Sequence, residues 1–161
     1  EPYRRQRQMC IRDRGITAEN AEEILAKFDV IVDASDNFPT RYLLSDTCMK
    51  LGKPDVYGAI CEFAGQVTVF ASDGPCLRCL CPEAKDPSGN PNSAAYGVLG
   101  VIPGMIGCMQ AAEVLKLLLG KGEALIGKML FIDAKTWSTD LIEVPVHPQC
   151  SCHAHTKVHR M

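Results

Sequence analysis

The 161-residue chain has almost no excess of charge of either sign: 17 lysines and arginines stand against 19 acidic residues, a net charge of −2. Domains that bind nucleic acid or anionic membranes carry a clustered excess of basic residues. We therefore expect neither nucleic acid nor a membrane surface among its partners. The chain also has no internal repeat, no low-complexity stretch and no signal-peptide pattern.

Long apolar runs are also scarce. The most apolar segment, residues 97–120, is interrupted by Gln110, Glu113 and Lys116. The uninterrupted part is about 13 residues, against the roughly 20 that span a bilayer. This composition favours a buried core helix over a membrane span.

Two nucleotide-binding signatures are missing as well. The chain contains neither a G-x-G-x-x-G fingerprint nor a Walker A loop. The first absence argues against a nicotinamide oxidoreductase with a zinc lobe, an alternative enzyme class. The glycines at 97, 100, 104 and 107 have a different spacing, and we predict that they allow a helix to pack closely on a sheet.

Cysteine, by contrast, is plentiful, with nine residues. An odd number in a chain of this length does not fit a secreted disulfide scaffold. Cys48, Cys61 and Cys108 lie singly in apolar segments, and we predict that they are small buried side chains. Five of the others cluster at positions 76, 79, 81, 150 and 152, which in a reducing compartment indicates metal before disulfide. This usage favours the cytoplasm.

The clusters have the spacing of a zinc site. Cys76 and Cys79 form a C-x-x-C pair, and Cys150 and Cys152 form a C-x-C pair that His153 adjoins. Structural Zn²⁺ takes four such ligands from two separate segments. The fourth ligand is open among Cys152, His153 and Cys81, and redox or free thiols are the alternative.

Hydrophobic periodicity predicts the order of elements. A short helix over residues 17–27, capped by Thr17, precedes an apolar strand over 28–34 that we expect helices to cover on both faces. A helix from Pro39 to Gly52, a strand over 55–61 and an antiparallel strand over 65–71 follow. A loop rich in proline and glycine leads to a helix over 101–119 and a hairpin of 128–134 with 139–144.

These elements predict an α/β fold, a Rossmann-like mixed sheet with a β-hairpin and a structural zinc site. Residues 1–14 are basic and lack any period, so we expect a non-native segment there. Residues 15–152 are expected to form part of one domain, and residues 153–161 a disordered tail.

A polar segment follows the first strand at residues 33–37. Ligands of open α/β sheets bind at the carboxyl ends of strands. There the Asp36 carboxylate is suited to Mg²⁺ and the Asn37 amide to a nucleotide. The alternative is that both residues only cap the following helix, where Asp and Asn are favoured.

Four ordered blocks together resemble the ThiF/MoeB/HesA family. They are DASDNFPTRYLLSD at 33–46, PCLRCL at 75–80, GVLGVIPGMIGCMQA at 97–111 with Glu113, and HPQC at 147–150. The resemblance covers residues 16–152 and implies the carboxyl-terminal part of an ATP-dependent adenylyltransferase. Such an enzyme activates the C-terminal glycine of a ubiquitin-like sulfur-carrier protein, MoaD-like or ThiS-like, for molybdopterin or thiamine biosynthesis.

The resemblance also implies roles for particular residues. Asp36 would be the catalytic and Mg²⁺-binding carboxylate, Asn37 a contact to ATP, and the protein a homodimer. The implied zinc ligands are Cys76, Cys79, Cys150 and Cys152. The family's glycine-rich phosphate loop is not in this sequence, so we expect the chain alone to be inactive. A zinc-stapled protein-binding module without catalysis is the alternative function.

Overall fold

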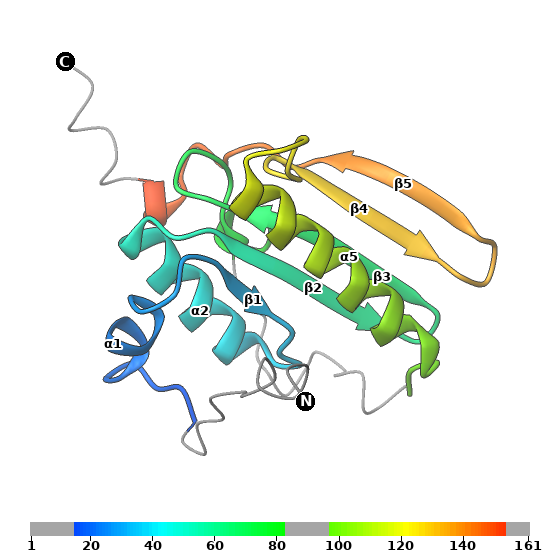
Figure 1. Cartoon of the computed structure of the whole chain (residues 1–161), viewed down its shortest axis with the longest axis horizontal. Coiled ribbons are helices and arrows are strands. Elements are labelled where there is room, and N and C mark those ends of the chain that lie inside the picture. The colour runs from blue at the N-terminus through cyan, green and yellow to red at the C-terminus, as the bar shows by residue number, and fades with distance from the viewer. Residues whose placement is uncertain (1–14, 83–96, 154–161) are drawn as a thin grey trace, which may run out of the picture.

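The computed structural model describes residues 15–82 and 97–153, which form a five-stranded sheet flanked by helices (Figure 1). The strands lie in the order β1-β2-β3-β4-β5, with β1 parallel to β2 and the other pairs antiparallel. Their bounds are Ile31–Asp33, Asp55–Cys61, Ala64–Phe70, Lys128–Asp133 and Ser138–Glu143. The predicted mixed α/β sheet, with β3 antiparallel to β2 and a final hairpin, is confirmed.

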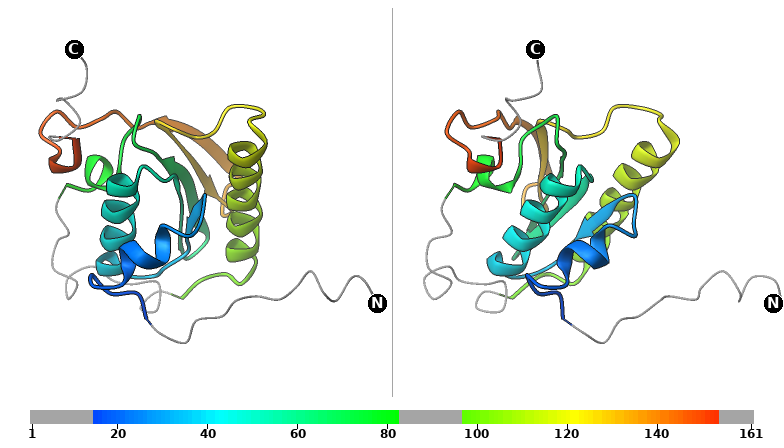
Figure 2. Two further views of the ribbon diagram at one scale, coloured as in Figure 1. Left: turned by 60° about the vertical axis from the view of Figure 1, so that its left-hand side comes forward. Right: turned by 90° about the vertical axis from the view of Figure 1, so that its left-hand side faces the viewer.

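Helices cover both faces of this sheet (Figure 2). On one face, α2 (Phe38–Leu51) packs Tyr42 against Tyr57 and Phe70, and α1 (Ala21–Leu25) packs on α2. On the other face, α5 (Val101–Leu119) packs against Val67. Two short helical turns, α3 (Leu77–Leu80) and η2 (Ser151–His153), lie beside each other at one end of the sheet.

The bounds of α2 agree with the sequence signals. Pro39 lies in the first turn, where a missing N–H leaves no bond unmade. Gly52 ends the helix with φ 65°, a left-handed conformation that glycine adopts without steric strain. Leu44 and Cys48 face the core, as the i, i+4 spacing predicts.

The first two elements are shorter than predicted. Thr17 does not cap α1; its backbone carbonyl accepts from the N–H groups of Asn20 and Ala21, and the helix begins at Ala21. The first strand has three residues instead of seven, because only these pair with β2. Val32 is 48% exposed, so the expectation that helices cover both faces of this strand is wrong for the described residues.

The long helix α5 is buried on one side only, which corrects the expectation of a buried core helix. Ile102, Ile106 and Gln110 face the sheet, whereas Leu115 and Leu119 are more than half exposed. Within the described ranges, α5 has the length and the composition of a membrane span, with a mean hydropathy of 1.4. Length and composition alone do not distinguish such a span from a helix that packs on a sheet.

Strand glycines, and not the helix glycines, allow α5 to approach the sheet. A Cβ at Gly58 would lie 2.5 Å from the Gln110 side chain, and one at Gly65 would lie 2.5 Å from Ile106. By contrast, a Cβ at Gly100, Gly104 or Gly107 would meet nothing within 4 Å. A Cβ at Gly97 would meet nothing either, so the prediction that the glycines at 97, 100, 104 and 107 allow this close packing is wrong.

Only one of the three single cysteines is buried as predicted. Cys48 on the inner side of α2 is 1% exposed, whereas Cys61 at the end of β2 and Cys108 on the outer side of α5 are exposed. Helical and strand periodicity allows an apolar residue on either face, and only the packing selects which face is covered.

Replacing Gln110 should destabilise the fold. Its Nε2 donates to the backbone carbonyls of Asp33 at 2.8 Å and Val56 at 3.0 Å, and the side chain is buried. Gln110→Ala leaves two buried acceptors unpaired and opens a cavity, so the free energy of unfolding should fall by about 2–4 kcal/mol. Urea denaturation measures this. Cys108→Ala on the exposed side of the same helix is the control, and an equal loss there would contradict the role of Gln110.

Candidate functional site

The carboxyl end of β1 runs into a loop held by two charged side chains. Asp33 Oδ1 accepts hydrogen bonds from the N–H of Ser35 at 2.8 Å and from its hydroxyl at 2.6 Å. In addition, Arg41 Nη2 donates to the Ser35 carbonyl. The loop therefore turns sharply after the strand and carries Asp36 to the entrance of α2.

Within this loop, the capping and candidate catalytic roles fall on different residues. The Asn37 side chain accepts from the N–H of Thr40 at 2.9 Å and is the N-cap of α2. Asp36 does not cap the helix, and its Oδ1 accepts from Asn37 Nδ2 at 3.2 Å. The capping alternative thus applies to Asn37, and the carboxylate of Asp36 stays available to a ligand.

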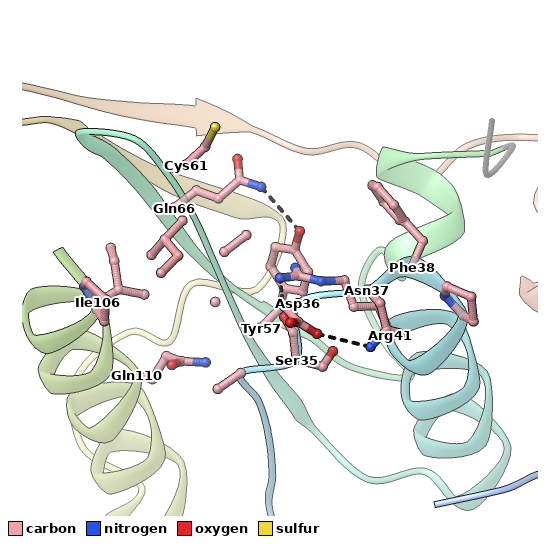
Figure 3. A pocket seen from close by; sticks show the side chains of 16 residues that line it. Ser35, Asp36, Asn37, Phe38, Arg41, Tyr57, Cys61, Gln66, Ile106 and Gln110 are labelled. Atoms are coloured by element: carbon pink, nitrogen blue, oxygen red, sulfur yellow. Dashed lines mark hydrogen bonds between the residues drawn. The ribbon is translucent and has the colours of Figure 1, made fainter. Parts of the chain in front are cut away.

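Asp36 and Asn37 line a pocket of about 550 Å³ between α2 and α5 (Figure 3). Its floor is the part of β2 that extends beyond β1, and Ile106 and Gln110 of α5 form one wall. The sequence does not single out four polar residues of the pocket, which are Arg41, Tyr57, Gln66 and Gln110. Of these four, only Arg41 could have been predicted, because it lies one helical turn after Asn37 on a predicted helix.

These polar side chains support one another in the pocket wall. Arg41 lies over the Tyr57 ring, 4.7 Å from its centroid, and Gln66 Nε2 lies 3.3 Å from the Tyr57 hydroxyl. Burial raises the pKa of Tyr57, and the Arg41 charge acts against that rise. The tyrosine is therefore a neutral hydrogen-bonding group, and the guanidinium supplies positive charge beside the pocket.

A second group of side chains has the composition of a metal site. One donor atom each from Cys76, Cys79, Cys150 and His153 lies within 4.8 Å of all the others. The Cys76 sulfur is 3.8 Å from that of Cys79 and 3.4 Å from that of Cys150. Two thiolates on one tetrahedral zinc lie about 3.8 Å apart, given Zn–S bonds of about 2.3 Å. His153 Nε2 is buried and has no hydrogen-bond partner in the described residues. A nitrogen that binds a metal ion needs no hydrogen-bond partner.

The structure thus groups three of the four proposed cysteines with His153. Cys152 is not a member of this group, and its Sγ is 3.4 Å from Asp46 Oδ1. Cys81 is not in the group either.

His153 was predicted to belong to a disordered tail, but it is part of the η2 turn. Residues 154–161 of that predicted tail lie outside the described part of the chain.

The metal group is attached to the helix that leads to the pocket. Arg78, between Cys76 and Cys79, donates to both carboxylate oxygens of Asp46 on α2 at 2.9 and 2.7 Å. Its guanidinium also lies over the Tyr42 ring, and the Tyr42 hydroxyl donates to the Cys81 carbonyl at 2.6 Å. The same helix therefore carries Asn37 at its start and contacts the cysteine group further along.

Comparison with known proteins gives one family. The family model described as the ThiF family matches residues 5–154. The chain is 52% identical over 135 residues to the SAMP-activating enzyme E1 of Haloferax volcanii, covering 84% of this chain and 50% of that protein. It is 49% identical over 141 residues to the sulfur carrier protein adenylyltransferase of Thermus thermophilus, covering 84% and 52%. The chain spans about half the length of these curated relatives.

Solved structures show the same fold at low sequence identity. The crystal structure of E. coli MccB with ATP superposes with a TM-score of 0.71 at 14% identity. It covers 88% of this chain, which corresponds to 44% of MccB. The likeness concerns the arrangement of helices and strands.

Because Asn37 caps α2 and Asp36 does not, substitutions at these two residues should affect stability differently. Asn37→Ala removes the acceptor for the Thr40 N–H and should lower the free energy of unfolding by about 1 kcal/mol. Asn37→Asp keeps a capping oxygen and should be nearly neutral, as should Asp36→Ala. Chemical denaturation compares the three variants. Equal destabilisation by Asp36→Ala would show that Asp36 takes part in capping.

Proposed function

Because the chain belongs to the ThiF family, we propose that it is part of an ATP-dependent adenylyltransferase that activates the C-terminal glycine of a ubiquitin-like sulfur-carrier protein. The carrier would be MoaD-like or ThiS-like and serve molybdopterin or thiamine biosynthesis. The carboxylate of that glycine attacks the α-phosphorus of ATP. A bond forms between a carboxylate oxygen and phosphorus, the bond to the β-phosphate oxygen breaks, and pyrophosphate leaves.

The observation that carries this proposal is the pocket at the end of β1. It brings a carboxylate, an amide and a guanidinium, those of Asp36, Asn37 and Arg41, to one opening between two helices. A site at the carboxyl end of a strand is where α/β sheets bind nucleotides. The relatives include a SAMP-activating enzyme and a sulfur carrier protein adenylyltransferase, and both names agree with this chemistry.

The free edge of β2 offers a place for an extended peptide. β1 pairs with β2 only at Asp55, Val56 and Tyr57, whereas β2 continues to Cys61. Residues 58–61 therefore border the pocket with a strand edge that has no partner strand among the described residues. A carrier tail that runs antiparallel to β2 along this edge would direct its carboxylate toward Asp36, because β1 ends there.

Asp36 and Asn37 would act by binding and orienting. Mg²⁺ prefers one or two carboxylates together with phosphate oxygens, and the Asp36 carboxylate fits that need. The ion, when bound, neutralises charge on the phosphates. Arg41 adds a fixed positive charge close by, while Asn37 holds the start of α2 and offers its Nδ2 to a nucleotide.

At the cysteine group we propose one structural zinc held by Cys76, Cys79, Cys150 and His153, in place of the Cys152 of the sequence-based assignment. The buried, unpartnered His153 Nε2 and the spacing of the three sulfurs support this set. Zinc here would join two segments that are 74 residues apart, at Cys76 and Cys150. Its chemical contribution is folding free energy.

A homodimer and a cytoplasmic location remain part of the proposal. The exposed apolar residues on the outer side of α5 are available for a protein contact, and they include Val101, Leu115, Leu118 and Leu119. Burial of such a surface is the usual source of association free energy between subunits. Sedimentation of the full-length protein would test the dimer.

ATP–pyrophosphate exchange by the full-length gene product tests the catalytic proposal. Asp36→Asn should fold normally and lower exchange by about 100-fold or more, the scale for losing a pre-organised charge. Asp29→Asn, the same change at the exposed approach to β1, should leave exchange unchanged. Full activity of Asp36→Asn would refute the role of Asp36. Carrier binding without any exchange would favour the non-catalytic binding module.

Elemental analysis of protein purified without added metal should find one zinc per chain. Cys76→Ser and His153→Ala should lose the metal and melt earlier, because structural zinc stabilises the folded state. Cys152→Ser should retain it, and Cys61→Ser is the control at an exposed cysteine. Stoichiometric iron, or no metal, would overturn the zinc site. Loss with Cys152→Ser and retention with His153→Ala would return Cys152 to the ligand set.

A further inference from the structure

Three charged side chains are buried behind the loop that carries Asp36. Asp33 is 0% exposed, Asp55 is 1% exposed and Arg41 is 8% exposed. In the described residues, Asp33 Oδ2, Arg41 Nη1 and both carboxylate oxygens of Asp55 have no hydrogen-bond partner. Nothing in the proposed adenylation uses Asp55.

The two acids lie on the same face of adjacent strands. Asp55 of β2 is opposite Ile31, and Asp33 of β1 is opposite Tyr57. Because directly opposed residues share a face and side chains alternate along a strand, both carboxyl groups point to the α2 side. Arg41 belongs to the same buried set and lies over Tyr57 on that side. With both acids ionised, the set of three would carry one uncompensated negative charge.

An uncompensated buried charge is strongly unfavourable, and a buried acid usually takes up a proton instead. We propose that Asp55 and Asp33 hold one proton between them at neutral pH and that Asp55 is thereby a positioning residue for the 33–36 loop. With Asp55 neutral, the charges of Asp33 and Arg41 balance. Asp33 then stays the acceptor for Ser35, and Arg41 the donor to the Ser35 carbonyl.

The surroundings agree with this assignment. Burial, followed by the charge of Asp33, raises the pKa of Asp55 well above its ordinary value, and Arg41 acts in the opposite direction. Burial and the two acids raise the pKa of the Cys48 thiol on α2 to about 12, so it is neutral. Tyr57 is neutral as well, because burial raises its pKa. Arg41 is therefore the only positive charge in the set.

A proton held on Asp55 makes the folded state less stable as pH rises. In the unfolded chain Asp55 ionises above about pH 4, whereas the folded pair keeps its proton. The folded state then binds more protons than the unfolded state, so stability falls as pH rises from about 4 to the folded pKa. Ionisation of Asp55 at still higher pH also loosens the loop, because it restores the uncompensated charge beside Asp33.

Carbon-13 NMR of the aspartate carboxyl groups in the unaltered chain tests the proton directly. The Asp55 signal should remain that of a carboxylic acid at pH 7, well above the pH at which a solvated aspartate ionises. Titration of both Asp33 and Asp55 near 4 would overturn the proposal, and this measurement needs no variant.

Melting curves of Asp55→Asn between pH 4 and 9 test the linkage. The neutral amide should raise Tm by about 3 °C or more at pH 7, and the difference should shrink toward zero near pH 4. A constant difference across this range would contradict a shared proton. Asp29→Asn is the control and should not change the pH profile.

Amide exchange tests the positioning role. As pH rises, protection of the Ser35 N–H should fall in the parent and persist in Asp55→Asn, which cannot ionise. The Thr40 N–H, held by Asn37, should behave alike in both proteins. Equal loss of Ser35 protection in the two proteins would show that Asp55 acts on stability alone.

Discussion

Gly58 and Gly65 leave room for α5 to lie directly against β2 and β3, and Gln110 uses that closeness to bond to the backbone of two strands. One of its acceptors, the Asp33 carbonyl, is at the last residue of β1. The contact therefore fixes where β1 ends relative to α5, and with it one wall of the pocket. A Cβ on either glycine would displace the side chain of Gln110 or Ile106 from its place on the sheet.

The other wall depends on α2, which connects two distant parts of the molecule. Its first turn is held by Asn37, and its middle is held by the ion pair between Asp46 and Arg78 and by the Tyr42 hydroxyl. An Arg–carboxylate pair with two parallel bonds restricts orientation as well as distance. The cysteine group thus constrains the helix whose start borders the pocket, although the two sites share no residue.

Buried charge distinguishes this region from an ordinary core. Local rules place acids on the surface, yet Asp33 and Asp55 are almost wholly covered. Asp33 shapes the loop by accepting hydrogen bonds from Ser35, and Arg41 supports the same loop by donating to the Ser35 carbonyl. Departures from local rules concentrate where a structure positions functional groups. The bond pattern around Ser35 connects these charges to the placement of Asp36.

Features that depend on residues close together in the sequence could be predicted from it. They are the course of α2 from Pro39 to Gly52, the extent of α5, the hairpin and the cysteine spacing. The tertiary structure alone decided which faces are covered and which distant groups meet. It exposed Val32 and Cys61, assigned the close approach of α5 to strand glycines, and grouped His153 with the cysteines while Cys152 lies beside Asp46. Periodicity shows which side chains share a face of one helix or strand. Which face is buried, and which residues form a ligand set, depend on segments far apart in the sequence.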